Sequence, residues 1–441
     1  VYKRQLPGIY EAGTTYTFLQ ANAINGEFDQ LLATHPLDFN LNYLSNAVQI
    51  QIASTGLILP EDINSLSGNA KEIAAYLFSP STFSAKGLFP ILRLLIKFPA
   101  GEFSDALLEL GPQQFGALAL SNLQTSVHTG HSMHRVKEAY ENYFSTCYQS
   151  FRKPNADLDQ SIWFNPIGYY YKQNEMEDQV PFNSRTYGFT TGYSARLFNH
   201  FIVNAGIGYS YSSLNWYQNN GCANIQSLSL SPSVGYMGKY GYAGIMVSGA
   251  RSFYDVDRKI HFSNIKRTAH NNHKSYDLLT GFTGALKLKF PDKFQKNLFL
   301  LPTVNLDYLN IFENGYQESG AGAIDLSVRN IHSAFLRPEM KLKLLKQFIM
   351  DTICASTDIY VGWVRNIPLT NGNYTSRFYK QQTCSKNFTV QSYHSSTDQV
   401  ILGAKLLMIH KDNFSIKMGY EANIGNHYNV QKGSINVDWM F

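Results

Sequence analysis

The last seven residues of the chain, Ile435 to Phe441, alternate strictly between two faces of a predicted strand. One face is entirely apolar: Ile435, Val437, Trp439 and Phe441. The other face is mostly polar and carries Asn436 and Asp438. The closing strand of an outer-membrane β-barrel needs this pattern, with lipid outside and a polar lumen inside. A half-buried strand at the end of a soluble domain would show the same alternation, so seven residues leave both interpretations open.

Similar alternating stretches recur from about Asp157 to the end of the chain. We predict twelve strands, at 162–172, 185–197, 200–214, 226–239, 241–254, 275–289, 298–312, 331–345, 356–367, 397–410, 413–424 and 431–441. Most of them exceed the usual length of globular strands and fit tilted strands that cross a membrane. Four contain a proline, where bulges or strand ends are expected because proline cannot donate to the ladder: Pro166, Pro232, Pro302 and Pro338.

The connections between these strands alternate in length. Those after the second, fourth and tenth strands are very short, and those after the sixth and eighth are modest. Longer ones follow the first, third, fifth, seventh and ninth strands, at 173–184, 215–225, 255–274, 313–330 and 368–396, and 425–430 is the short exception. Bacterial outer-membrane barrels keep short turns on the periplasmic side and long loops outside. The sequence therefore predicts an all-β transmembrane barrel of twelve antiparallel strands over residues 157–441.

The composition excludes two other classes of protein. Mean hydropathy is −0.23, and no run of about 18 apolar residues exists, so membrane-spanning helices are not expected. The net charge of +5 comes without a long run of Lys and Arg, so nucleic acid is not an expected partner. The chain begins with Val1 and shows no secretory signal, so we expect that an N-terminal part is missing.

The residues ahead of the strands follow a different pattern. From Pro112 to about Tyr148 the sequence predicts one long helix, with Gly130 as a possible weak point. This helix is too polar for lipid or a dry core but suits a polar lumen, which about 30 residues, or about 45 Å, can thread. Residues 56–111 are predicted to form short helices. The first 55 residues are predicted to form short strands at the end of a stacked β-solenoid.

Several short motifs occur in order along the chain. Glu109 to Leu118 reads ELGPQQFGAL, Glu318 to Val328 contains ESGA and LSV, and Gly362 to Val364 reads GWV. They resemble, respectively, the opening of the linker helix and two barrel segments of the autotransporters of Gram-negative type V secretion. Arg365 stands where that family often has His. Residues 13–52 resemble the junction that ends an autotransporter passenger, so the resemblance covers essentially the whole chain.

The resemblance implies both a domain order and a function. It implies the end of a passenger β-solenoid at 1–55, a helical linker at 56–111, a pore helix at 112–150 and the barrel at 157–441. Such a protein exports its own N-terminal passenger and anchors it at the surface of the cell, with the residues before the pore helix outside. The implied partners are outer-membrane lipid, the barrel-assembly machinery that reads the final strand, and the passenger itself. A monomer without cofactor, nucleotide or metal is implied.

Charged residues fall on the predicted lumen face of several strands: Arg196, Arg337, Glu339, Lys341, Lys343, Lys405, Lys417 and Glu421. In one interpretation they hold the helix, through Glu138 and Glu141 among others. In the other they are solvated charges without specific partners, since exposed ion pairs contribute little. The pattern alone leaves both open.

The cysteines have no CxxC spacing, so a zinc site of the usual kind is not expected. The topology places Cys222 and Cys384 in outer loops and Cys147 and Cys354 near the periplasmic end, so either pair is a possible disulfide.

The helix carries His128, His131 and His134 in i, i+3 spacing, but without carboxylate or Cys support we expect polar surface and no metal site. The chain has no G-x-S-x-G elbow, Ser/His/Asp cluster or HExxH motif, so no catalytic residue is assigned and no enzyme is expected. Asn122 is a candidate for cleavage of the chain within its own pore, but the polarity of the helix explains it adequately.

Two other functions compete with this hypothesis. A stand-alone outer-membrane barrel, either a channel or a barrel enzyme, would have no use for solenoid strands and a polar helix in residues 1–150. A soluble adhesin made of β-structure does not account for the alternating connections or for Phe441.

Overall fold

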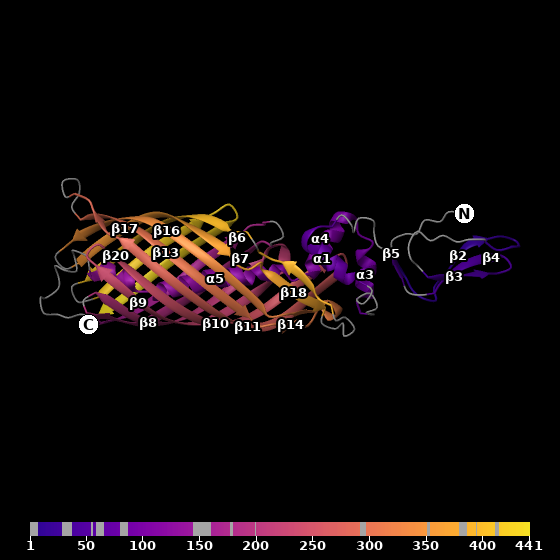
Figure 1. Cartoon of the computed structure of the whole chain (residues 1–441), viewed down its shortest axis with the longest axis horizontal. Helices are drawn as coiled ribbons and strands as arrows, with labels where there is room; N and C mark the ends of the chain where they lie inside the picture. Colours follow the sequence, from indigo (N-terminus) through magenta and orange to yellow (C-terminus); the bar gives the residue numbers. More distant parts are fainter. Residues whose placement is uncertain are drawn as a thin grey trace. The chain divides into compact units, whose positions relative to one another are not determined.

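The computed structural model describes residues 8–28, 38–53, 56–58, 66–79, 87–143, 160–176, 180–198, 200–291, 297–350, 353–378, 386–393, 395–410 and 414–441 (Figure 1). The chain forms two compact units. The first comprises residues 1–111, 322–324 and 377–389, and the second comprises residues 112–321, 325–376 and 390–441.

The first unit contains short antiparallel strands and three described helices. Strand β1 (Gly8–Tyr10) pairs with β5 (Gly56–Ile58). Strands β2 (Thr15–Gln20), β4 (Ala47–Ile52) and β3 (Phe39–Tyr43) form a sheet in the order β2-β4-β3. The helices are α1 (Gly68–Leu77), α3 (Phe89–Leu95) and α4 (Ala100–Leu110). Because the described strands pair antiparallel, unlike the parallel coils of a solenoid, the assignment of residues 1–55 to a solenoid end stays a prediction.

Twelve long strands form the wall of the second unit: β6 (Gln160–Gln173), β7 (Phe182–Leu197), β8 (Phe201–Trp216), β9 (Gly221–Gly238), β10 (Gly241–Phe262), β11 (Ile265–Leu286), β13 (Leu298–Glu313), β16 (Ile331–Ile349), β17 (Ile353–Pro368), β20 (Thr397–His410), β21 (Phe414–Ile424) and β22 (Tyr428–Met440). Each pairs antiparallel with its neighbours, and the ladders β22–β6 and β11–β13 close the ring. The two-residue strand β12 (Leu288–Lys289) continues the pairing of β11 with β13. The predicted twelve-stranded barrel is confirmed.

Side chains alternate across this wall as the sequence predicts. Outward positions carry exposed apolar residues such as Tyr187, Ile207 and Leu230. Inward positions between them are buried and mostly small or polar, such as Ser184 and Asn204. A closed ladder satisfies every backbone group of the wall without water, as a membrane requires. The core of the unit is therefore the lumen of the barrel.

The four prolines lie inside strands, and each marks a local gap in one ladder. The ladders lack the pairs that would join Pro166 to β22, Pro232 to β10, Pro302 to β11 and Pro338 to β17. The ladder on the other side of each proline is continuous. The expected irregularities are thus present, because proline lacks the N–H that one neighbour needs.

The prediction of a loop at 255–274 is wrong. There β10 and β11 continue as a paired ribbon to a tight turn at Ser263, whose φ is 50°. The outward face of this ribbon is polar and charged, as in Asp255, Lys259 and Lys266, so it lacks the outward apolar residues on which the predicted strands rest. The predicted loops 313–330 and 368–396 supply a further sheet, in the order β14 (Tyr316–Gln317), β15 (Leu326–Val328), β18 (Asn373–Phe378) and β19 (Phe388–Gln391).

Among the described residues, no helix combines the length and the apolar character needed to cross a bilayer.

Candidate functional site

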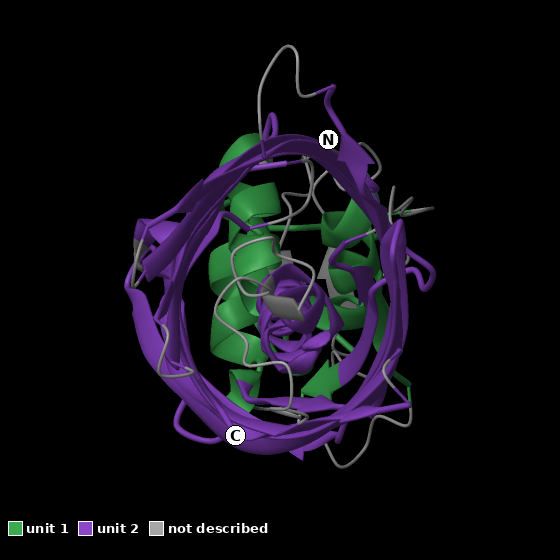
Figure 2. Ribbon diagram, turned by 90° about the vertical axis from the view of Figure 1, so that its left-hand side faces the viewer, with its two compact units in different colours: residues 1–111, 322–324, 377–389 green, residues 112–321, 325–376, 390–441 purple. Residues whose placement is uncertain are grey.

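A helical segment fills the lumen of the barrel. It consists of a short 3₁₀ turn η2 (Gln113–Phe115), α5 (Gly116–Met133) and α6 (Val136–Tyr143). Figure 2 shows the purple helix inside the ring of purple strands. The side chains of α5 are buried although many are polar: Ser121, Asn122, Gln124, Thr125, Ser126, His128 and Thr129. The predicted placement of a polar helix in the lumen is thus observed, and residues 144–150 of its predicted range lie outside the described residues.

The helix is not continuous, which corrects the prediction of one long helix. It breaks after α5, where His134 adopts an extended conformation with φ −84° and ψ 91°. Gly130, the expected weak point, lies within α5 instead. A Cβ at Gly130 would come within 2.6 Å of Leu279 Cδ2 on β11, so a larger residue there would require the Leu279 side chain to shift.

Polar groups of α5 bond to the lumen face of β10 and β11. Asn122 Nδ2 donates to Asp277 Oδ2 at 2.8 Å and to the Tyr254 hydroxyl at 3.0 Å. Ser126 Oγ donates to the same Asp277 oxygen at 3.2 Å. On β7, three strands from β10 in the ring, the hydroxyl of Ser184 lies 3.1 Å from that of Ser121. Buried polar groups that find partners across an interface fix its register, because an unpaired group in a dry site is costly.

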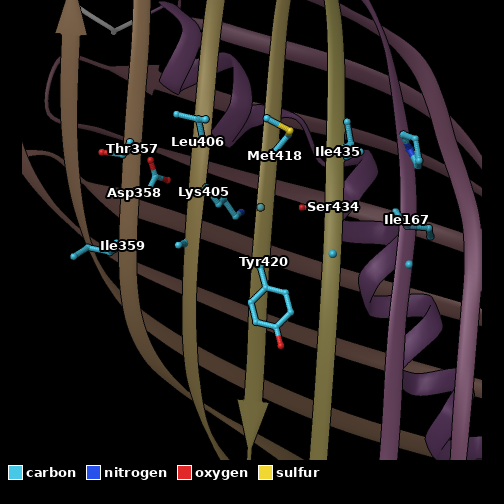
Figure 3. Close-up of a pocket in the computed structure, with 15 residues that line it drawn as sticks. Ile167, Thr357, Asp358, Ile359, Lys405, Leu406, Met418, Tyr420, Ser434 and Ile435 are labelled. Carbon is cyan, nitrogen blue, oxygen red and sulfur yellow. The ribbon is translucent and has the colours of Figure 1, made fainter.

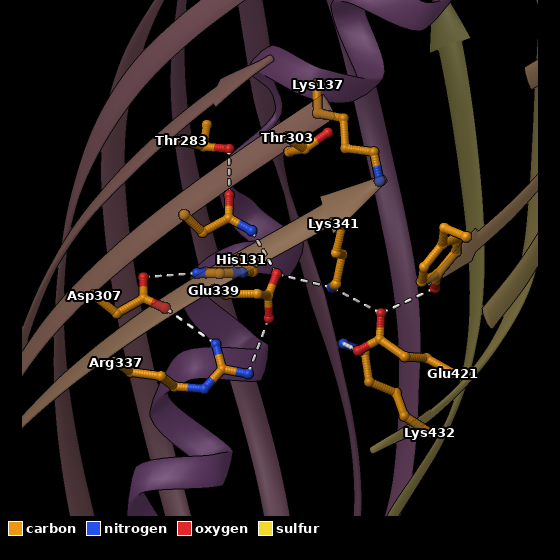
Figure 4. Close-up of polar contacts among 12 residues, drawn as sticks. His131, Lys137, Thr283, Thr303, Asp307, Arg337, Glu339, Lys341, Glu421 and Lys432 are labelled. Atoms are coloured by element: carbon orange, nitrogen blue, oxygen red, sulfur yellow. Dashed lines mark hydrogen bonds and ion pairs between the residues drawn. The ribbon is translucent and has the colours of Figure 1, made fainter. Parts of the chain in front are cut away.

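Near the C-terminal half of α5, a chain of charges leaves the helix and returns to it, and Figure 4 shows its course from His131 to Lys432. It starts at His131, whose Nε2 lies 2.7 Å from Asp307 Oδ1. From Asp307 it continues through alternating cations and carboxylates at separations of 2.8–3.3 Å: Arg337, Glu339, Lys341, Glu421 and Lys432. It ends at His128, whose Nδ1 lies 3.3 Å from Lys432 Nζ. Strands β13, β16, β21 and β22 are thus linked to one helix face.

The region around α6 adds two further ionic contacts to the closing strands. Lys417 on β21 contacts Glu141 and lies 3.8 Å from Glu138. Arg135 contacts Asp438 on β22 and donates to Asn436 Oδ1 at 2.7 Å. Charge-assisted hydrogen bonds of this kind are stronger than neutral ones, and removing one buried partner leaves the other uncompensated.

Aromatic side chains surround the beginning of the helix. The ring of Phe115 is fully buried and lies 5.7 Å from Tyr316, 6.3 Å from Tyr374 and 6.4 Å from Trp216, between ring centroids. We call these four residues the collar. Trp216 Nε1 donates to the Gln114 carbonyl at 2.9 Å, and the Tyr374 hydroxyl donates to the Phe115 carbonyl at 3.0 Å. The collar therefore packs against the helix start and also bonds its backbone.

The remaining lumen charges lie beside the helix. Lys343 and Lys405 line a cavity of about 130 Å³ together with Lys137 and Glu138. Arg196 lies on the lumen face of β7 near its end, opposite Ile202 in the ladder. The residues predicted for the lumen wall thus fall on the lumen face, and Arg337, Glu339, Lys341, Glu421 and Lys417 belong to the networks that reach the helix.

The closing strand β22 has the predicted orientation. Ile435, Trp439 and Phe441 are 46 %, 63 % and 47 % exposed on the outer face, which Val437 shares. The backbone of Phe441 exchanges hydrogen bonds with Gln160 of β6 at 3.0 and 3.3 Å, which pairs the end of the chain with the first strand.

A hollow of about 820 Å³ lies on the outer wall beside this seam. Met418, Tyr420, Ile435 and Ile167 surround it (Figure 3), and Gly433, where an added Cβ would meet no atom within 4 Å, leaves it open. Its lining is mostly apolar, as the lipid-facing side of a barrel requires.

The cysteines correct one prediction. Cys222 carries a free thiol and lies within β9, paired with Asn215 and Asp257 in the ladders, so the predicted disulfide with Cys384 is wrong. The strand extends into the range predicted as a loop, and this fixes Cys222 in the wall. Cys354 is disulfide-bonded. Cys147 and Cys384 lie outside the described residues, so the pairing of Cys354 with Cys147 stays a prediction.

The histidines of the helix contact different protein groups. His128 packs against Tyr169 with ring centroids 4.9 Å apart, while His131 faces Asp307. Within the described residues, no group of three His, Cys, Asp or Glu side chains has metal-binding geometry.

Several partners of the helix were missed by sequence reasoning: Asp277, Asp307, Lys432, Asp438 and the collar. The strand alternation could have identified the three aspartates and Lys432, because each occupies an inward position of a predicted strand. The collar could not be found this way, since Tyr316 and Tyr374 lie in segments predicted as loops.

Comparison with known proteins identifies similar barrels. The family model described as Autotransporter beta-domain matches residues 162–421. The translocator domain of the autotransporter NalP from Neisseria meningitidis is 14 % identical, with a TM-score of 0.57, and the match covers 75 % of this chain and 100 % of that chain. The β domain of the Bordetella autotransporter Brka is 12 % identical, with a TM-score of 0.49 over 64 % of this chain and 100 % of that one. No curated protein sequence matches this chain.

Proposed function

This chain belongs to the autotransporter β-domain family, and from that membership we propose that its barrel delivers the segment ahead of the pore helix to the cell surface and keeps it there. The barrel is an autotransporter translocator of the outer membrane, not a stand-alone channel.

The observation that carries the proposal is the density of polar bonds between the helix and the lumen wall. Bonds reach the helix from both sides of the ring, and the ion pairs of Arg135 and Lys417 hold the region of α6 to β21 and β22. A channel would gain nothing from a polar helix that fills its lumen. For a translocator, the same helix tethers whatever precedes it in the chain.

We assign the end of the barrel that carries the collar to the cell exterior. The longest strands and the connections with their own sheet lie at that end, and short turns lie at the other. Residues 1–111 precede the helix at the collar end, so this orientation puts them outside. Phe441 then lies on the periplasmic side, where β22 is available to the barrel-assembly machinery.

We further propose that the barrel acts as a monomer and has no enzymatic activity. The ring closes on itself through β22 and β6 and needs no second chain. Several polar groups of the lumen bond to the helix, and this role accounts for Asn122 through its bonds to Asp277 and Tyr254.

Export can be tested with residues 1–441 behind a signal peptide and an epitope tag near residue 60. We expect the outer-membrane fraction to contain a band whose gel mobility shifts on boiling, since folded barrels resist detergent until heated. We expect antibody to bind the tag on intact cells. In a matched variant, a second tag in the turn at Lys239–Tyr240 should stay hidden until the cells are permeabilised.

The outcomes separate the competing functions. A heat-shifted band with the tag near residue 60 hidden would contradict export and favour a channel. Exposure of the Lys239–Tyr240 tag on intact cells would contradict the proposed orientation.

A further inference from the structure

Two cations stand on the outer wall of the barrel, on neighbouring strands. Arg251 of β10 and Lys274 of β11 occupy outward, exposed positions. In the β10–β11 ladder, Arg251 pairs with Tyr276, and Lys274 pairs with Phe253. The two cations and the two rings therefore form one square on the surface, and we call these four residues the outer patch.

The rings hold the cations against the wall. The guanidinium carbon of Arg251 lies 5.3 Å from the ring centroids of both Phe253 and Tyr276. Lys274 Nζ lies 5.7 Å from the Phe253 centroid. Cation–π contacts of this length position a charge without neutralising it.

The outer patch lies at the border of the apolar band. Ten residues separate Gly241, at the start of β10, from Arg251. At about 3.4 Å per residue and a tilt of about 40°, this corresponds to a height of about 25 Å, which is the height of the lipid-facing band of a barrel. Below the patch the outward residues are apolar, such as Val247 and Leu278. Lipid headgroups therefore begin at the level of the two cations.

No ion pair joins Arg251 or Lys274 to a carboxylate in the part of the chain that the structure describes. Two acidic residues follow on the outward side of β10, Asp255 and Asp257, but both face His270, at 3.6 and 3.0 Å. The patch thus presents two positive charges where a membrane protein meets anionic headgroups, with aromatic rings beneath them that favour the same level.

We propose that the outer patch binds a phosphate group on the headgroup of a phosphorylated glycolipid in the outer leaflet. The planar Arg251 guanidinium matches phosphate oxygens in a two-point contact, and Lys274 adds a second charge. The rings of Phe253 and Tyr276 then contact the upper part of the acyl chains. The choice of leaflet rests on the orientation proposed above, whereas recognition of phosphate by the patch does not.

Purified, folded 1–441 in a neutral detergent can be titrated with lipid A, with lipid A stripped of its phosphates, and with phosphatidylglycerol, and bound lipid counted by native mass spectrometry. The test variant is Arg251→Gln with Lys274→Gln. The matched control is Lys239→Gln, because Lys239 Nζ lies 5.4 Å from the Tyr240 ring at the opposite end of the wall. The shift in gel mobility on boiling checks that each variant is folded.

We expect the unmodified protein to bind lipid A more tightly than either other lipid. The double variant should lose about thirtyfold in apparent affinity, as two interfacial charges of about 1 kcal/mol each imply, and Lys239→Gln should bind normally. Equal affinity for phosphate-free lipid A, or an unchanged double variant, would overturn the proposal. A preference for phosphatidylglycerol would overturn the leaflet assignment. None of these outcomes affects the export test, which does not depend on lipid binding.

Discussion

At the scale of single residues, the contact between Asn122 and Asp277 is the one on which the attachment of the first half of α5 to the wall most depends. Asp277 is buried and accepts from Asn122, Ser126 and Ser275, and Asn122 also donates to the Tyr254 hydroxyl. We predict that Asn122→Ala lowers the stability of the folded barrel by about 1–3 kcal/mol, because a buried carboxylate loses its closest donor. The temperature at which the gel mobility shifts measures this loss.

Thr129→Ala is the matched control for Asn122→Ala. Thr129 is equally buried on α5, but its hydroxyl bonds to the carbonyls of Thr125 and Ser126 on its own helix. A fall in the shift temperature as large as that of Asn122→Ala would mean that the contact with the wall is not responsible. An unchanged Asn122→Ala barrel would mean the same.

At the same scale, the sequence predicts which face a residue occupies but not which partner it meets. The alternation along β16 and β21 assigns Glu339, Lys341 and Glu421 to the lumen, as observed. Their order in the chain of charges depends on the stagger between strands, and the contact of Lys417 with Glu141 spans 276 positions in sequence. No periodicity contains that information.

At the scale of elements, the collar packs around the start of the helix, at the end of the lumen that we propose faces outward. We predict that Phe115→Ala loosens this end, since removing a buried Phe ring costs about 3–5 kcal/mol and the helix start would release at least about a hundredfold more often. Single-channel recordings in planar bilayers should show longer open events. The control is Phe312→Ala, because Phe312 is an exposed ring on the outer face of β13.

Conductance that Phe115→Ala and Phe312→Ala raise equally would contradict this role of the collar.

The collar also illustrates the limit of prediction for elements. Long, strictly alternating strands are found correctly because one side meets lipid and the other the lumen. The sequence predicts a loop for the ribbon of β10 and β11 beyond the membrane, because a strand needs outward apolar residues only where it faces lipid. Beyond the headgroups the apolar alternation therefore ends, although the strands continue.

At the scale of the whole molecule, the chain combines a closed wall with a segment of the same chain inside it. That segment breaks between α5 and α6, where His134 is extended. The family match identifies the barrel as an autotransporter translocator, and the contacts within the lumen explain why its helix stays in place.

The most direct test of this claim is a cross-link between helix and wall in living cells. Ser121→Cys with Ser184→Cys places two thiols where the hydroxyls lie 3.1 Å apart, in a Cys222→Ser background. Ser121→Cys with Arg185→Cys is the control, because Arg185 faces outward. A disulfide in the first pair only, seen as a change in mobility on reduction of the boiled protein beyond the change that the Cys222→Ser parent shows through its Cys354 disulfide, is the predicted result. No disulfide in the first pair in folded barrels, or equal cross-linking of both pairs, would contradict a helix held in the lumen.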